Sequence, residues 1–231
     1  MEKNVFNWPK QKKMYFYLKS FLDWIAATVL LFFSWWVIVI CMIAIKIDDT
    51  SSSPLYNSER IGYHERPFKM YKLRTIRVDM SHTEVVLDDM LTKPGRFIRK
   101  YSLDELPQLV NILKGDMSFI GPRPLIRRYI PYYTDKEHLR HSVRPGITGL
   151  AQINGRAGLQ WDKRFEIDVE YIENLSFSHD MKIIFRTFGK VLSKADVLSG
   201  SDGNEEDLVS FDEYRKLQMK TNSQRVQADG E

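Results

Sequence analysis

The sequence has very little cysteine and none of the common short motifs for binding phosphate or zinc. Its single cysteine, Cys41, excludes an internal disulfide and gives no reason to expect an oxidising compartment. There is no Gly-rich loop of the GxxxxGK type, no CxxC pair, no HExxH and no internal repeat. The histidines show no metal-ligand spacing, and we expect His138 and His141 to lie on a solvated helix face. Standard nucleotide-binding loops and standard zinc sites are therefore unsupported.

Charge is absent from Trp24 to Ile45, a run of 22 residues. As a helix this run is long enough to cross the roughly 30 Å hydrocarbon core of a membrane. A signal peptide is the weaker interpretation, because bulky Trp35 and Trp36 lie in mid-segment and Lys46 follows it in place of a small-residue cleavage site. Cations flank both ends, so charge fits a spanning helix and a helix that re-enters the cytoplasmic side equally well.

The 231 residues leave room for a membrane anchor and one compact domain. We expect a basic N-terminus and membrane helix at 1–47, a catalytic domain at 48–198 and a polar tail at 199–231. The net charge is +4, but the tail holds eight acidic and four basic residues, so the body before it carries about +8. A basic body beside an apolar segment favours lipid headgroups or phosphorylated substrates as partners.

Hydrophobic periodicity predicts a mixed α/β core that is mostly helical. Residues 68–77 (FKMYKLRTIR) have the composition of a short strand, in which Lys72 and Arg74 would share one face. Apolar residues spaced at three and four predict an amphipathic helix at 102–114. The strand and this helix carry most of the candidate chemistry.

Further helices are expected toward the C-terminus. One is predicted at 161–174 and a second, basic and amphipathic, at 181–198. The second could lie on a membrane surface or pack against the core of the protein. The tail is expected to be partly disordered, apart from a short helix near 211–217.

Two adjacent carboxylates, Asp104 and Glu105, occupy the first turn of the helix predicted at 102–114. Ser102 with Glu105 forms a capping-box pattern. Free backbone amides and the helix dipole would favour an ionised carboxylate there, so Asp104 could act as a nucleophile. A structural role is also open, because acidic residues are common in first turns and Glu105 could simply complete the cap.

Basic residues surround this segment in the sequence. Arg99 precedes it, and Arg123 follows it between two prolines that restrict the backbone and would present the guanidinium with little entropy lost on binding. The same residues are also consistent with solvated surface charge. Further candidates for binding phosphate are Lys72, Arg74 and Arg144.

Three blocks in order resemble the monotopic phosphoglycosyl transferases, a family of bacterial sugar transferases. The blocks are FKMYKLRT at 68–75, YSLDELPQLVNILKGDMSFIGPRPL at 101–125 and RPGITGLAQINGR at 144–156. The resemblance covers about residues 20–195 and fits the small members that consist of little more than the catalytic core.

The resemblance implies that Asp104 attacks the phosphate bearing the sugar of a UDP-sugar, expelling UMP and leaving a phosphosugar on the enzyme. Undecaprenyl phosphate would then attack this intermediate, which would initiate capsule, exopolysaccharide or glycoprotein glycan synthesis. Glu105 resembles the family's ligand for Mg²⁺, and Arg123 matches the nucleotide pocket. Positions matching phosphate-binding residues are Lys72, Arg99 and Arg144, and Asp168 matches a recurrent acidic position that we include among the substrate-binding candidates.

The family also implies a helix that re-enters the bacterial inner membrane among its lipids, with the active site facing the cytoplasm. Members usually break this helix at a Ser-Pro pair, whereas this chain has Ser34-Trp35 and no proline between Pro9 and Pro54. The kink that a proline imposes is therefore absent from the sequence. The usual Asp-Pro-Arg segment is reduced to LTKPGRF at 91–97, which leaves part of the sugar pocket unassigned.

Two other functions compete with this interpretation. A catalytically silent membrane module that binds anionic lipid or glycan-assembly partners is disfavoured by the presence of both Asp104 and Glu105. Nucleic-acid binding is supported by charge but lacks a base-reading motif and leaves the apolar segment unexplained. The sequence does not fix the oligomeric state or the glycan that is built, and we favour an N-acetylated donor sugar over glucose or galactose.

Overall fold

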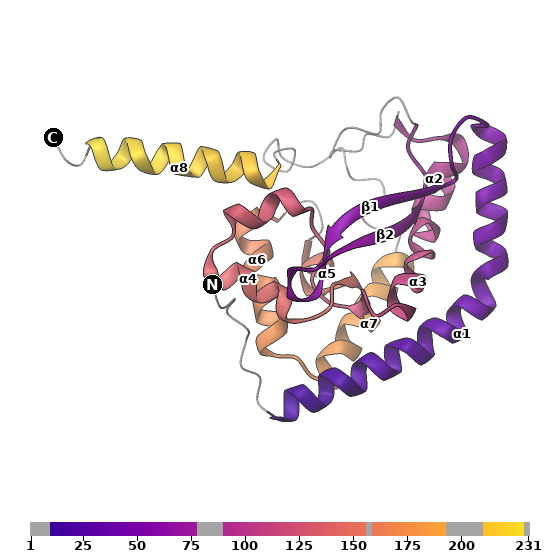
Figure 1. The fold of residues 1–231 in the computed structure, drawn as a ribbon, viewed down its shortest axis with the longest axis horizontal. Helices are drawn as coiled ribbons and strands as arrows, with labels where there is room; N and C mark the ends of the chain where they lie inside the picture. Colours follow the sequence, from indigo (N-terminus) through magenta and orange to yellow (C-terminus); the bar gives the residue numbers. More distant parts are fainter. Residues whose placement is uncertain (1–9, 78–89, 156–158, 193–209, 229–231) are drawn as a thin grey trace.

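The computed structural model describes residues 10–77, 90–155, 159–192 and 210–228. In these residues the chain is mostly helical, with two small two-stranded sheets (Figure 1). The predicted mixed α/β class, mostly helical and with one long apolar N-terminal helix, is confirmed.

Helix α1 (Lys10–Asp48) begins well before the uncharged segment and ends three residues after it. It changes direction along its length, so that its N-terminal half passes under the body and its C-terminal half rises along one side (Figure 1). By length and composition alone the helix could cross a membrane. Ala27, Cys41 and Ile45 are buried against the body, whereas Trp35 and many other large apolar residues of α1 are exposed.

An antiparallel hairpin follows α1. Strand β1 (Leu55–Ile61) pairs with β2 (Pro67–Leu73), with Lys72 opposite Tyr56. The strand predicted at 68–77 is therefore shorter than expected, and beyond it Ile76 forms only an isolated bridge with Leu91. The hairpin places Lys72 one residue before the end of β2.

The helix predicted at 102–114 is divided into two elements. A 3₁₀ turn, η4 (Leu103–Glu105), follows helix α2 (Lys93–Lys100) and precedes α3 (Gln108–Leu113). Proline explains the division, because Pro107 has no amide hydrogen and its ring would clash with the carbonyl of Leu103 in a continuous helix. The predicted capping box is wrong, since Ser102 adopts the left-handed conformation with a φ of 55° and its side chain makes no capping hydrogen bond.

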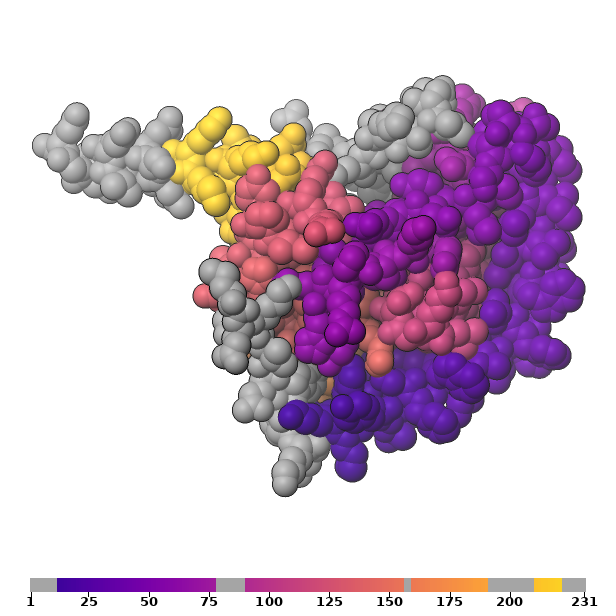
Figure 2. All heavy atoms as spheres, in the orientation of Figure 1, coloured from indigo at the N-terminus to yellow at the C-terminus, as the bar shows by residue number. Residues whose placement is uncertain are grey.

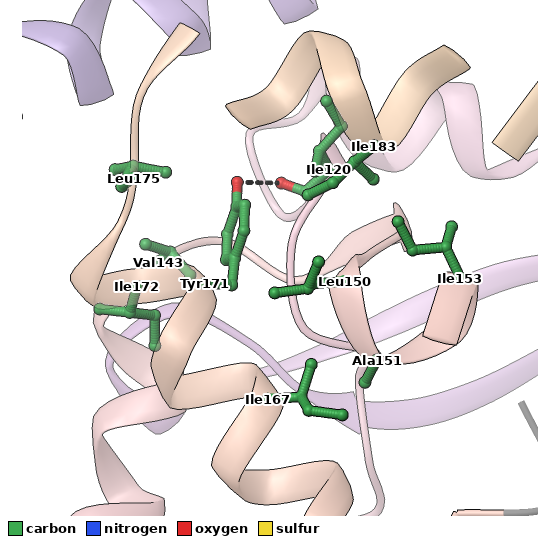
Figure 3. Close-up of a cluster of buried hydrophobic side chains, with 10 residues drawn as sticks. All are labelled: Ile120, Val143, Leu150, Ala151, Ile153, Ile167, Tyr171, Ile172, Leu175 and Ile183. Carbon is green, nitrogen blue, oxygen red and sulfur yellow. Dashed lines mark hydrogen bonds between the residues drawn. The ribbon is translucent and has the colours of Figure 1, made fainter. Parts of the chain in front are cut away.

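A second sheet and three helices enclose the main core. Strand β3 (Ser118–Ile120) lies parallel to β4 (Gly146–Thr148). Helices α5 (Leu150–Gly155), α6 (Trp161–Glu173) and α7 (Phe177–Leu192) pack around this sheet through a cluster of buried side chains that includes Ile120 and Ile183 (Figure 3). Four short elements, η1 (Tyr63–Glu65), η5 (Arg127–Tyr132), α4 (Asp135–His138) and η6 (Leu139–Ser142), complete the body.

Helix α7 has one buried and one exposed apolar face. Ile183 is fully buried, whereas Phe177, Phe185 and Phe188 are exposed. The helix predicted at 161–174 is confirmed as α6, and α7 corresponds to the helix predicted at 181–198, of which residues 193–198 lie outside the described residues. The inner face of α7 therefore packs on the core, and its placement on a membrane surface stays a prediction.

The C-terminal helix α8 (Phe211–Ala228) projects from the body (Figures 1 and 2). Phe211 is fully buried among the aromatic rings of Tyr129, Tyr133 and Phe165. The helix predicted near 211–217 is confirmed and is longer than expected, while residues 199–209 and 229–231 of the predicted tail lie outside the described residues. Phe211 therefore anchors the tail to the body.

Candidate active site

Lys72, Asp104 and Glu105 meet where β2 ends beside η4. The Lys72 Nζ lies 2.9 Å from Asp104 Oδ2 and 3.5 Å from Glu105 Oε1. The Arg123 Nη1 lies 4.0 Å from the same Glu105 oxygen. Arg99 is near enough to interact electrostatically with both carboxylates and with Arg123. Five of the eight predicted site residues are therefore brought together.

The backbone around Ser102 presents Asp104 to this cluster. The left-handed Ser102 turns the chain out of α2 and into the 3₁₀ turn, with the Glu105 amide donating to the Ser102 carbonyl at 3.2 Å. Asp104 is 2% exposed, and the side chain of Glu105 is 22% exposed. Of the two adjacent carboxylates, one is thus enclosed and the other reaches solvent.

The pKa of the Asp104 carboxyl is raised, because burial outweighs the effect of the neighbouring cations. Burial raises the pKa of this carboxyl, Lys72 and Arg99 act to lower it, and the nearby Glu105 raises it further. Burial also lowers the pKa of Arg99. With three cations facing two carboxylates, the cluster carries excess positive charge and suits an additional anionic group such as a phosphate.

Arg123 lies on a rigid loop at the rim of the cluster. Its side chain is 53% exposed, so it is open to a ligand. The loop passes so close to the β4 segment that a Cβ on Gly121 would lie 2.3 Å from the carbonyl oxygen of Arg144. The backbone carbonyl of Arg123 also accepts a 2.7 Å hydrogen bond from Arg140 Nη2. The proline-bounded segment is therefore held from both sides.

Three predicted site residues make their contacts elsewhere. Arg74 lies just past β2, and its Nε donates to the carbonyl of Ser53 at 2.9 Å. Arg144 donates to the carbonyl of Gly115 at 2.8 Å and also bonds to Ser20 of α1. The third, Asp168, is 3% exposed on α6 and its partner is Arg140. Binding of substrate by these three residues stays a prediction.

Glu105 is the residue of this cluster that could hold a metal ion. The described ranges contain no group of three or more His, Cys, Asp or Glu side chains that could hold an ion. Mg²⁺ is commonly held by one or two carboxylates together with substrate phosphates and water. The partly exposed carboxylate of Glu105, beside a cluster that suits phosphate, fits this kind of site.

The sequence model of a known family covers most of the chain. A model described as bacterial sugar transferase matches residues 14–194. The chain belongs to this family. The predicted resemblance is thereby confirmed, and the carboxylate and cation cluster of this transferase lies entirely within the matched residues.

Three similar proteins show how much of this chain its relatives share. The uncharacterized sugar transferase EpsL of Bacillus subtilis (strain 168) is 48% identical over 177 residues, covering 76% of this chain and 87% of that protein. The UDP-glucose:undecaprenyl-phosphate glucose-1-phosphate transferase of Escherichia coli (strain K12) is 41% identical over 66% of this chain and 36% of that protein. A protein of the same name from Caulobacter vibrioides is 36% identical, covering 76% of this chain and 70% of that protein.

Arg140 of the transferase was not among the predicted site residues. It is 3% exposed and bonds to Asp168 Oδ2 through Nη2 at 2.9 Å and through Nε at 3.2 Å. Its Nη1 donates to the Tyr133 hydroxyl at 3.2 Å. Burial acts to lower the pKa of Arg140, but Asp168 and Tyr133 outweigh it, so the pKa is raised. In the sequence Arg140 is only one more arginine, four residues before Arg144, and nothing in its local sequence indicates that it is buried.

The prediction of a solvated face for both histidines near Arg140 is wrong for His141. This ring is 7% exposed, and its Nδ1 lies 3.2 Å from the carbonyl of Gly62. Burial and the neighbouring Arg140 lower its pKa to about 3, so the ring is neutral near pH 7. His138 remains partly exposed and contacts Glu65 at 2.6 Å. The packing of η6 between η1 and α6, which is a tertiary effect, accounts for the difference.

Proposed function

We propose that this sugar transferase moves a sugar 1-phosphate from a UDP-sugar to undecaprenyl phosphate and releases UMP. The observation that carries the proposal is an enclosed carboxylate, Asp104, which is paired with Lys72 inside a cluster with excess positive charge. The relatives named as glucose-1-phosphate transferases support this reaction class. The lipid-linked product would begin the assembly of a capsule, an exopolysaccharide or a glycoprotein glycan.

In the first step an Asp104 oxygen attacks the phosphorus that bears the sugar. The bond between this phosphorus and the UMP oxygen breaks, UMP leaves with the bonding electron pair, and an aspartyl phosphosugar forms. Since the Asp104 carboxylate loses its charge in forming this acyl phosphate, Lys72 is released to pair with the phosphoryl oxygens. Arg99 and Arg123 supply further fixed positive charge for the diphosphate.

In the second step an oxygen of undecaprenyl phosphate attacks the same phosphorus. The bond to Asp104 breaks, the carboxylate returns to its pairing with Lys72, and a polyprenyl diphosphate sugar is released. Glu105 would hold Mg²⁺, and the ion when bound would neutralise charge on UMP as it leaves in the first step. Because the two substrates use one site in turn, ping-pong kinetics are expected.

We propose that α1 re-enters the cytoplasmic leaflet of the inner membrane, with the active site facing the cytoplasm. Lys19, near the start of α1, pairs with Asp180 at 3.1 Å, and Ile45, near its end, packs with Leu73 and Ile98. These two points are about 39 Å apart along a straight helix, which exceeds the roughly 30 Å hydrocarbon core. A body on one side of a bilayer could not contact both ends of such a spanning helix.

Cysteine labelling tests this topology. Lys13→Cys and Asp48→Cys, each in a Cys41→Ser background, are treated with a membrane-impermeant maleimide in inside-out and right-side-out vesicles. Both positions are expected to react only from the cytoplasmic face. Reaction of the two positions from opposite faces would show that α1 spans the membrane.

The reaction is tested by UMP release from detergent-solubilised protein with Mg²⁺ and undecaprenyl phosphate. The donor panel includes UDP-glucose and UDP-galactose, which the names of the relatives suggest, and the N-acetylated UDP-sugars that we favoured from the sequence. Asp104→Asn should abolish release, whereas Asp135→Asn, an exposed site on α4, should not change it. Silence of the folded wild type toward every donor would favour a non-catalytic membrane module.

A further inference from the structure

A buried amide on α3 joins the two elements that carry the proposed catalytic groups. Asn111 is 0% exposed. Its Oδ1 accepts the Tyr71 backbone amide at 3.0 Å, and its Nδ2 donates to the Lys69 backbone carbonyl at 2.7 Å. Both of these backbone groups belong to β2, while Asn111 lies in the middle of α3. One side chain thus bonds to a strand and holds it against a helix.

The side-chain amide of Asn111 takes the place of a third strand. Strand β2 pairs with β1 along one edge, and the groups of Lys69 and Tyr71 that bond to Asn111 point away from that edge. An amide side chain offers one acceptor and one donor, which match this pair of backbone groups. Asn111 Nδ2 also lies 3.3 Å from Asp116, and the Asn111 carbonyl accepts the Asp116 amide at 3.0 Å. The helix, the turn after it and the strand are therefore tied at one residue.

Both elements that Asn111 joins carry a residue of the proposed active site. Lys72 directly follows Tyr71 on β2, and Asp104 lies in the turn that leads into α3. A shift of β2 along α3 would move Lys72 Nζ from its 2.9 Å contact with Asp104. We propose that Asn111 is a positioning residue, an inference that rests on the proposed function. Asn111 sets the register of β2 against α3 and so keeps Lys72 paired with the nucleophile, Asp104.

The first test is independent of activity. The protein is labelled with trace acetic anhydride, and the rate of modification of each lysine is measured by mass spectrometry. In Asn111→Ala the paired and mostly enclosed Lys72 should react several-fold faster, whereas Lys163, exposed on α6, should react at the wild-type rate. Asn174→Ala, at an exposed asparagine, is the matched control and should change neither rate. An unchanged rate at Lys72 in a folded Asn111 variant would overturn the proposal.

The second test is a double-mutant cycle on UMP release. Asn111→Ala should lower kcat by about 100-fold, the scale expected when a catalytic group is misplaced by about 1 Å. In a Lys72→Met background the same change should cost less than about 3-fold, because Lys72 is already lost. Equal losses in both backgrounds would show a merely structural role for Asn111 and overturn the proposal.

A second variant covers the case in which Asn111→Ala does not fold. Asn111→Leu keeps nearly the same side-chain volume but removes both the acceptor for the Tyr71 amide and the donor to Lys69, so its Lys72 labelling rate should rise as in Asn111→Ala. A wild-type labelling rate in Asn111→Leu would contradict the proposal. If the wild type releases no UMP with any donor, the proposed function fails, and the labelling result still decides whether Asn111 fixes Lys72.

Discussion

Replacing Arg140 by Met should destabilise this sugar transferase strongly. Arg140 donates two hydrogen bonds to the same Asp168 oxygen, Oδ2, and the two side chains are only 2% and 4% exposed. Loss of the guanidinium leaves the Asp168 carboxyl buried without its cation, and removing one partner of such a pair costs about 3–5 kcal/mol. For a domain of this size each kcal/mol lowers Tm by about 2–4 °C, so the expected loss is roughly 6–20 °C.

Thermal unfolding in detergent, followed by near-UV circular dichroism, measures this loss. The double variant Arg140→Met/Asp168→Leu should recover most of it, because replacing a whole buried pair by apolar residues is often nearly neutral. Arg128→Met is the control, since Arg128 is 52% exposed in its pair with Asp212 and should cost no more than about 1 kcal/mol. If Arg140→Met loses no more stability than this control, the reasoning is refuted.

Three further changes have expected outcomes. Lys72→Met should slow the first-step release of UMP by at least about 100-fold, no less than the loss expected when Asn111→Ala misplaces Lys72, because Asp104 loses its closest cation; an unchanged single-turnover rate would contradict this. His141 has a folded pKa of about 3 against its ordinary 6.5, so its stabilisation is present above pH 6.5 and is lost as pH falls. Between pH 6.5 and 5 the wild type should lose about 1.5–2 kcal/mol more than His141→Asn in denaturant titrations, and parallel profiles would refute the burial argument. Phe211→Ala removes the fully buried anchor of α8, a change that costs about 3–5 kcal/mol in a core, so limited trypsin should cleave after Arg215 more than 10-fold faster; equal rates would show that other contacts hold the helix.

The centre of the site was predictable because its residues form continuous blocks. Asp104 and Glu105 are adjacent in the chain, and Arg123 is fixed by the prolines around it, so local sequence already limits where their side chains can lie. Lys72 was predicted as a phosphate-binding residue, from its strand position and from the resemblance, but its pairing with Asp104 was not predicted. Period-two alternation also assigned Arg74 to the same face, but β2 ends at Leu73 and the side chain of Arg74 bonds to Ser53.

The supporting residues were not predictable, since their roles depend on contacts between distant parts of the chain. Asn111 bonds to backbone groups 40 and 42 residues away, and Arg140 pairs with a residue 28 positions later. An asparagine in an amphipathic helix or an arginine beside two histidines gives no local sign of burial. In each case the polar group is buried because its partner is buried with it, and the pairing exists only in the folded chain.

The path of α1 is a further case in which tertiary contacts replace a local signal. A Ser-Pro pair would bend this helix by removing a backbone hydrogen bond, and the chain has no proline there. Polar residues on the inner face of its N-terminal half bond to the body instead: Lys19 to Asp180 at 3.1 Å, and Asp23 Oδ2 to the Ser118 hydroxyl at 2.7 Å. These groups cannot enter a hydrocarbon core without large cost, so their pairing holds this half of α1 against the body while its apolar outer face remains exposed. The direction of α1 is therefore set by its polar inner face, which must bond to the body, and not by a proline.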